Sequence, residues 1–204
     1  MTFRPPDDPD SDELLLSRTA AGDAEAFARL FQRRQGQVFR FALHMTGSIT
    51  IAEDVTQEAF LRVMRDAGRF EAGRSAVVSW LCGIARNCAL QRLERERPYQ
   101  AWNEDDEPGA GEGTATVDPV GALVRAEGIE QVRQAVLSLP IRYREVVALC
   151  DLQELSYAET ADALGCAVGT VRSRLHRARA LLASKLSHVS QESAGRIAGA
   201  RSCA

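Results

Sequence analysis

Residues Ser156–Leu186 read SYAETADALGCAVGTVRSRLHRARALLASKL. Two helix-forming segments flank Gly165-Cys-Ala here, and Gly165 can take the positive φ that a tight turn between two helices needs. Ser156 and Glu159 have the spacing of a capping box, which marks the start of the first helix. An apolar stripe recurs along the second segment at three- and four-residue steps: Val168, Val171, Leu175, Ala178 and Leu182. This pattern predicts a helix-turn-helix.

Positive charge is concentrated on the second of these helices. The whole chain has a formal net charge of −3, yet residues 168–188 contain five cations and no Asp or Glu. A solvated basic helix face is common, so charge alone would not favour DNA over solvent. Together with the turn, the capping box and the apolar stripe, the charge predicts a recognition helix whose polar face enters the major groove of DNA.

The candidate DNA contacts of this helix divide by chemistry. Arginine pairs bidentately with guanine O6 and N7, with a discrimination of about 1–3 kcal/mol per pair. We expect Arg172 and Arg177 to read bases, and Arg174 and Arg179 to contact phosphates toward the flanks. Thr170, together with the helix N-terminus, also suits phosphate. The full candidate set is Thr170, Arg172, Ser173, Arg174, His176, Arg177 and Arg179.

The composition of the chain indicates a helical protein. Of 204 residues, 45% are hydrophobic, 26% are charged and only 6% are aromatic, which is typical of a soluble globular protein rich in helix. The first ten residues, MTFRPPDDPD, lack the pattern of a signal peptide. No apolar stretch approaches the roughly 18–20 residues that span a bilayer. We therefore expect a cytoplasmic protein with no membrane insertion.

An acidic segment divides the chain into two domains. Residues 99–124 contain six acids, four glycines and no Lys or Arg, so we expect a flexible linker there. The predicted domains cover residues 11–98 and 125–187, and residues 188–204 are expected to be a disordered tail. The predicted fold is all-α, with two small helical domains joined by this flexible acidic linker. The second domain is expected to be a four-helix, winged-helix-like helix-turn-helix domain.

Periodicity and capping residues predict where the helices lie. Asp23 is a candidate N-cap, Thr50 and Glu53 form a second capping box, and Pro140 suits a first helical position. No strand is expected anywhere in the chain. We expect helices over residues 11–21, from residue 23 onward, and over 50–67, 76–97, 125–138, 140–150, 156–164 and 168–186.

The segment AEDVTQEAFLRVMR, residues 52–65, separates into two faces on a helix. Its apolar positions serve the core: Val55, Ala59, Phe60 and Val63. The opposite face holds two acids, an amide and a leucine at i, i+3, i+4 and i+7: Asp54, Gln57, Glu58 and Leu61. Such a face can dock a basic partner helix, although a solvated surface stripe explains the pattern about as well.

A second candidate nucleic-acid site lies between residues 69 and 87. Asn87 follows Arg86 on a predicted helix, and the loop Arg69–Arg74 lies upstream. Asparagine suits hydrogen bonding to base edges, and a basic loop beside a helix can hold an unstacked base. The candidate residues are Arg69, Arg74, Arg86 and Asn87. Core packing is the favoured explanation for Trp80.

The cysteines and histidines do not form a site. Five cysteines are scattered without a CxxC pair, and the three histidines do not cluster near them, so no metal and no disulfide framework is expected. Small buried side chains are the favoured explanation for the cysteines, and a thiol redox sensor is the alternative. There is no nucleophile–base pair and no phosphate-cradling glycine loop, so no catalytic residue, no cofactor and no enzyme is expected.

Three motifs occur together in a specific order: Asp54-Val-Thr-Gln-Glu-Ala-Phe60, Trp80-Leu-Cys-Gly-Ile-Ala-Arg-Asn87, and Leu139-Pro140 followed by Gly169-Thr-Val-Arg-Ser-Arg174. In this order the chain resembles the extracytoplasmic-function (group 4) sigma factors of bacterial RNA polymerase. The resemblance covers about residues 11–187.

The resemblance implies specific partners. Asp54, Gln57 and Glu58 match the helix that grips the coiled coil of the polymerase β′ subunit. The loop Arg69–Arg74 and Asn87 match positions that melt the minus-ten promoter element and capture an extruded base. The second domain would read the minus-thirty-five element and bind the polymerase β flap, and a separate anti-sigma factor would restrain the protein. A stand-alone DNA-binding regulator remains the alternative, but it leaves the 52–65 helix unexplained.

Overall fold

The computed structural model describes residues 11–96 and 121–200. Within these two ranges all regular structure is helical, so the predicted all-α fold is confirmed, and no β wing occurs there. The first range forms α1 (Asp12–Ala20), α2 (Ala24–Thr46), α3 (Ile49–Asp66), a short 3₁₀ turn η1 (Ala67–Arg69) and α4 (Val77–Glu96). The second range forms α5 (Gly121–Leu137), α6 (Ile141–Val147), a π turn η2 (Ala148–Leu152), α7 (Tyr157–Leu164) and α8 (Val168–Ala200).

Local capping explains where the N-terminal helices begin. Asp23 caps α2 as predicted, because its Oδ1 accepts hydrogen bonds from the amides of Glu25 and Ala26 at 2.9 and 3.0 Å. These bonds, with one from the Arg18 guanidinium, lower the pKa of Asp23. The predicted capping box at Thr50 is wrong: Gly47, at φ +74°, ends α2, and the Ser48 hydroxyl already caps α3.

The core of the N-terminal half forms where α2 and α3 pack together. The rings of Phe27, Phe31 and Phe60 lie edge to face or tilted, with centroids 4.9–6.4 Å apart. The four positions predicted to serve the core from α3 are all buried: Val55, Ala59, Phe60 and Val63. Because these residues are buried, the opposite face of α3 points away from the core.

The helix-turn-helix has the geometry that its sequence predicts. The Ser156 and Glu159 side chains bond reciprocally to each other's backbone amides, and Gly165 takes φ +62° between α7 and α8. The predicted stripe is buried at Val171, Leu175 and Ala178, whereas Val168, the first residue of α8, is 40% exposed. Pro140 is the N-cap of α6 rather than its first residue.

Three predicted boundaries in the second half were wrong. Helix α5 begins at Gly121, inside the expected linker, and α6 gives way to a π turn at Ala148 rather than continuing as α-helix to residue 150. Helix α8 runs to Ala200, so the expected tail is helical over 188–200, where no proline interrupts a run that includes Gln, Glu, Ala and Arg. Residues 97–120 and 201–204 lie outside the described residues.

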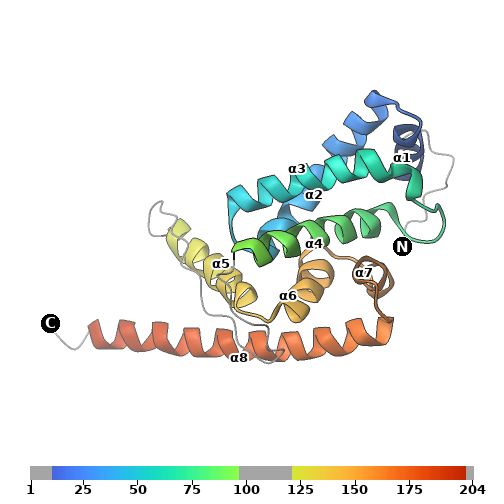
Figure 1. Cartoon of the computed structure of the whole chain (residues 1–204). Helices are drawn as coiled ribbons and strands as arrows, with labels where there is room; N and C mark the ends of the chain where they lie inside the picture. The colour runs from blue at the N-terminus through green and yellow to red at the C-terminus, as the bar shows by residue number, and fades with distance from the viewer. Residues whose placement is uncertain (1–10, 97–120, 201–204) are drawn as a thin grey trace.

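The two halves pack against each other. Figure 1 shows α5, α6 and α7 between α4 and the long helix α8, with α7 against α4 and the end of α2 near α5 and α6. A Cβ on Gly83 of α4 would lie 3.2 Å from the carbonyl oxygen of Ala163 in α7, a tight contact, so this approach favours glycine. Within the described ranges no helix has the length and apolar character needed to cross a membrane.

Candidate functional site

The exposed face of α8 carries the predicted base readers. Arg172, Ser173, His176 and Arg177 are exposed, and all lie on the side of α8 away from the buried stripe. Thr170 is partly buried, and its carbonyl oxygen accepts a hydrogen bond from Ser173 Oγ at 3.0 Å. The structure therefore places the expected base-reading residues together on one basic surface.

The predicted phosphate contacts of α8 are held by carboxylates. Arg179 donates two hydrogen bonds to Asp151, at 2.5 and 3.1 Å, and these raise the pKa of Arg179. Arg174 lies with its Nη1 3.5 Å from Oε1 of Glu145. Both arginines thus bind an anionic oxygen in the free chain, which is the chemistry expected of them toward phosphate. Sequence gave no signal for these pairs, because their partners lie 28 and 29 residues away.

A tyrosine that the sequence did not single out supports one of the base readers. A hydrogen bond from the Arg177 guanidinium lowers the pKa of Tyr143. The guanidinium carbon of Arg142 lies 5.1 Å from the centroid of the same ring, which is within cation–π range. Tyr143 is 9% exposed, so the exposed Arg177 side chain contacts a tyrosine that is itself buried.

The predicted acidic face of α3 is present, and it also carries exposed apolar side chains. Gln57 is exposed, Leu61 is 61% exposed, and Met64, which the sequence did not single out, adds a further apolar side chain that is 51% exposed. Asp54 and Glu58 lie on the same face and are only partly exposed. Met64 lies three residues after Leu61, so helical periodicity could have identified it.

Two arginines balance the carboxylates of this face. Arg62 donates to Glu58 at 2.5 Å, and Arg92 of α4 lies 3.4 Å from Asp54 and 3.8 Å from Glu58. The face therefore combines acids that are already oriented with apolar side chains that nothing covers in the described residues. This combination suits a partner surface that is itself basic and partly apolar.

The predicted minus-ten residues are not gathered in one place. Arg69 is the last residue of η1, and Arg74 lies in the loop before α4. Their side chains are 83% and 77% exposed and pair with Asp66 at 3.6 Å and Glu71 at 2.8 Å, respectively. Arg86 and Asn87 lie about 14 Å along α4 from its start, at 1.5 Å per residue. Asn87 is exposed, whereas Arg86 donates from Nε to Glu145 at 2.6 Å.

The tryptophan of α4 anchors the loop, as core packing predicts. Trp80 is partly buried, and its ring meets that of Phe70 edge to face, with centroids 5.6 Å apart. Phe70 follows Arg69 directly in the chain, so this contact fixes the start of the basic loop against α4.

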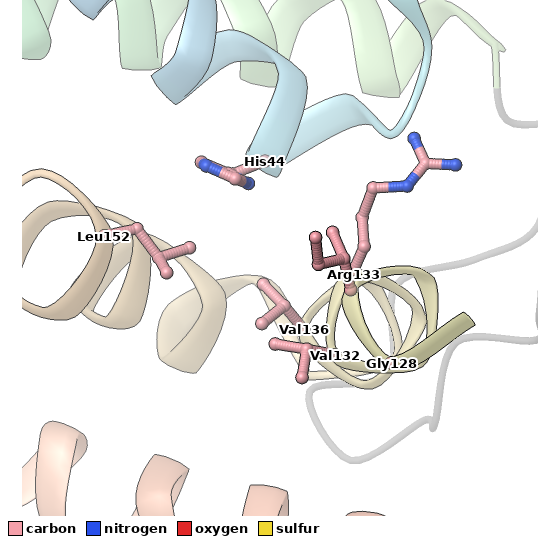
Figure 2. A pocket seen from close by; sticks show the side chains of 7 residues that line it. His44, Gly128, Val132, Arg133, Val136 and Leu152 are labelled. Atoms are coloured by element: carbon pink, nitrogen blue, oxygen red, sulfur yellow. The ribbon is translucent and has the colours of Figure 1, made fainter. Parts of the chain in front are cut away.

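An apolar cavity of about 540 Å³ opens between the two halves of the protein. Figure 2 shows its walls, with His44 from α2 opposite Val132 and Val136 of α5 and Leu152 of η2. Burial, with the nearby charges of Arg40 and Arg133, lowers the pKa of His44. The cavity is therefore a largely apolar recess, although Arg133 also lines it, and one of its lining side chains, Ile129, is 70% exposed.

Two of the described cysteines, Cys82 and Cys88, are buried as expected, whereas Cys150 and Cys166 are only partly buried. Burial raises the pKa of Cys82 to about 12 and that of Cys88 to about 11, which disfavours the reactive thiolate. Burial also raises the pKa of Cys150, whose sulfur lies 3.2 Å from Thr160 Oγ1. Cys203 lies outside the described residues. In the ranges 11–96 and 121–200, no three His, Cys, Asp or Glu side chains gather as metal ligands.

Family models match both halves of the chain. The model described as "Sigma-70 region 2" matches residues 30–99, and that described as "Sigma-70, region 4" matches residues 129–182. The first match includes α3 and α4, and the second includes the helix-turn-helix of α7 and α8.

Similar proteins cover most of the chain. The "ECF RNA polymerase sigma factor SigM" of Mycobacterium tuberculosis is 37% identical over 179 residues, which are 88% of this chain and 86% of that protein. The SigW protein of Bacillus subtilis, described in the same terms, is 31% identical over 84% of this chain and 94% of its own length.

Solved structures share the fold. CnrH, in complex with the cytosolic domain of CnrY, is 25% identical and superposes with a TM-score of 0.66 over 87% of this chain and 97% of its own. The sigma factor RpoE of Bartonella quintana, in complex with the anti-sigma factor NepR, is also 25% identical, with a TM-score of 0.62 over 80% of this chain and 98% of its own.

Proposed function

The chain belongs to the extracytoplasmic-function sigma factors of the sigma-70 family, and from this premise we propose how its two halves divide the work at a promoter. As a sigma factor it binds core RNA polymerase and directs promoter-specific initiation of transcription. The observation that carries the proposal is the pairing of two unlike surfaces. The α3 face is acidic and apolar, and the α8 face is basic.

The N-terminal half is proposed to bind polymerase and open the DNA. Asp54, Gln57, Glu58 and Leu61 would meet the coiled coil of the β′ subunit, because a basic and partly apolar helix complements that face. The exposed loop arginines Arg69 and Arg74 and the exposed Asn87, with Arg86, would hold the melted minus-ten strand. Anchoring of the loop by Trp80 supports this role.

The C-terminal half is proposed to read the minus-thirty-five element. The exposed polar face of α8 enters the major groove, with Arg172 and Arg177 on base edges and Ser173 and His176 between them. Thr170, Arg174 and Arg179 would contact phosphates. The same half would bind the polymerase β flap. The proposed domain limits are residues 11–98 and 125–187, with residues 99–124 as the linker.

Two substitutions in α8 separate base reading from phosphate contact. We expect Arg172→Ala to relax discrimination at one promoter position by about 1–3 kcal/mol, because a bidentate pair to guanine is lost. Arg179→Ala should weaken binding about equally on all sequences and reduce the salt slope by about one. Anisotropy titrations of holoenzyme on single-position promoter variants, at several salt concentrations, measure both effects. Equal losses on every sequence for Arg172→Ala would show that the two faces are assigned wrongly.

Restraint by an anti-sigma factor is part of the proposed function. The B. quintana relative of similar fold is bound to such a factor. On this chain the apolar cavity between α2, α5 and η2, beside the exposed Ile129, offers a place for apolar side chains of a regulatory helix.

The protein would act in the bacterial cytoplasm, where RNA polymerase and the chromosome are. It would act by binding alone, without catalysis of its own.

Footprinting of the holoenzyme on a responsive promoter tests this division of labour. We expect protection of the upstream duplex around the minus-thirty-five element and permanganate-reactive thymines around the minus-ten element. Asn87→Ala should reduce the thymine reactivity while leaving the upstream protection in place. Loss of the upstream protection alone would contradict the assignment of the two halves.

A further inference from the structure

We propose that the free chain closes on itself, and that the Glu145 carboxylate is the latch that holds an arginine from each half. The importance of the latch for transcription rests on the proposed function, because Arg86 and Arg174 belong to the two proposed DNA-binding sets. The closure itself rests only on the contacts described below.

Glu145 lies at the junction of the two halves and is 2% exposed. Its Oε2 accepts a hydrogen bond from Arg86 Nε of α4 at 2.6 Å, and its Oε1 lies 3.5 Å from Arg174 Nη1 of α8. Each carboxylate oxygen therefore holds one guanidinium. Removing one partner of a buried ion pair is strongly unfavourable, because an uncompensated charge remains. The buried carboxylate therefore favours the arrangement in which Arg86 stays beside it.

Further polar contacts hold the same two halves together. Arg144, the neighbour of Glu145, donates to the carbonyl oxygen of Met45 at 2.6 Å, and Arg133 donates to that of Gly47 at 3.3 Å. These carbonyl groups belong to the C-terminal end of α2, where positive charge is favoured. Apolar contacts alone would not specify how the two halves are oriented, whereas these hydrogen bonds require each guanidinium to face a particular carbonyl oxygen.

Closure covers part of the α4 surface that is proposed to meet DNA, namely the part that holds Arg86. Helix α7 lies directly over Gly83, with the Ala163 backbone at contact distance, and Arg86 is one turn further along α4. Phosphates or bases would need the same guanidinium donors that Glu145 already holds. Closure and DNA binding therefore compete for Arg86, and an event that separates the halves releases this arginine. Arg174 lies in the same half as Glu145, so it stays beside that carboxylate when the halves separate.

Two substitutions are expected to open the chain by different routes. Glu145→Gln keeps the shape of the side chain and removes the charge that holds both arginines. Gly83→Leu replaces a poor helix former in α4 with a good one and inserts a side chain where the Ala163 backbone lies. The matched control is Asp151→Asn, which frees Arg179 of the same helix α8 but removes no contact between the halves.

Small-angle scattering of the free full-length chain measures closure directly. Fluorescence anisotropy with single-stranded minus-ten DNA measures its consequence, because Arg86 belongs to the proposed minus-ten set. We expect both opening variants to increase the radius of gyration and to raise the DNA affinity of the free chain about 10-fold, because the competent fraction increases. Asp151→Asn should leave the radius of gyration unchanged and raise the affinity less. Run-off transcription with saturating core polymerase should stay within about twofold of wild type for both opening variants.

The outcomes separate the latch from the proposed function. Unchanged scattering in both opening variants, or an Asp151→Asn effect on affinity as large as that of Glu145→Gln, would overturn the latch. If circular dichroism shows that Glu145→Gln is unfolded, Gly83→Leu decides alone: opening supports closure, and unchanged scattering overturns it. Absence of transcription by the wild-type chain with core polymerase would instead contradict the proposed function and leave the scattering result standing.

Discussion

Asp54→Ala combined with Gln57→Ala is expected to weaken binding of the chain to core polymerase by about 2–4 kcal/mol, or roughly 30- to 1,000-fold. The two side chains lie one turn apart on the outer face of α3, and Asp54 is held in place by Arg92 at 3.4 Å. A carboxylate that is oriented before binding loses little freedom when a basic partner docks. Titration of labelled chain with purified core enzyme measures the effect.

A control on the same helix makes this result specific. Glu53 is exposed and adjacent to Asp54, but about 100° around the helix from it. Glu53→Ala removes the same charge from α3 and should change core affinity by less than about 0.5 kcal/mol. Core affinity that is unchanged in the double variant, or a loss in Glu53→Ala of equal size, would remove the case for this face as the polymerase contact.

Leu175→Ala is expected to lower the free energy of unfolding by about 2–5 kcal/mol. Leu175 is 1% exposed at the centre of the stripe that holds α8 on its neighbours, and truncation there leaves a cavity. Leu181→Ala is the matched control, because Leu181 lies on the same helix and is 38% exposed. Its expected cost is within about 0.5 kcal/mol. Urea unfolding followed by circular dichroism compares the two variants.

The stability of Leu175→Ala also bears on DNA recognition. At a temperature where the variant remains folded, its minus-thirty-five affinity should be close to that of wild type, because the proposed base-reading face of α8 is unchanged. Equal unfolding energies for Leu175→Ala and Leu181→Ala would mean that the stripe does not hold the recognition helix.

Features that depend on a few neighbouring residues could be predicted from the sequence. The capping box at Ser156, the positive φ of Gly165 and the N-cap at Asp23 all follow from local chemistry, and each is present. The buried face of α3 follows from helical period alone. The same reasoning failed at Thr50 because Ser48, directly after the left-handed Gly47, caps the helix first.

Features that depend on distant residues could not be predicted. Glu145 and Arg86 are 59 residues apart in the chain, and nothing in the local pattern of either residue indicates the other. The apolar run directly after Glu145, residues 146–150, predicts only a buried helix, so the acid at its start has no assigned partner until the fold is known. The preference for glycine at position 83 could not be predicted either, because the backbone that a side chain there would crowd is that of Ala163, in the other half.

The positions of the charges suggest how the two halves cooperate. In the described structure the basic face of α8 is exposed, while Arg86 of α4 is engaged by Glu145. One of the two proposed promoter-reading surfaces is thus available in the free chain, and the other is partly covered. Binding to polymerase through α3 would let the enzyme set the distance between the two, so that productive reading requires the holoenzyme.

The most direct test of the central claim is transcription in vitro with purified core RNA polymerase on fragments of host DNA. We expect initiation at a defined subset of start sites that appears only when the chain is added. We also expect this initiation to be lost when Asp54→Ala with Gln57→Ala replaces the wild-type chain at limiting concentration. Tight, sequence-specific DNA binding by the free chain, with no change in the start sites used by core polymerase, would contradict the central claim.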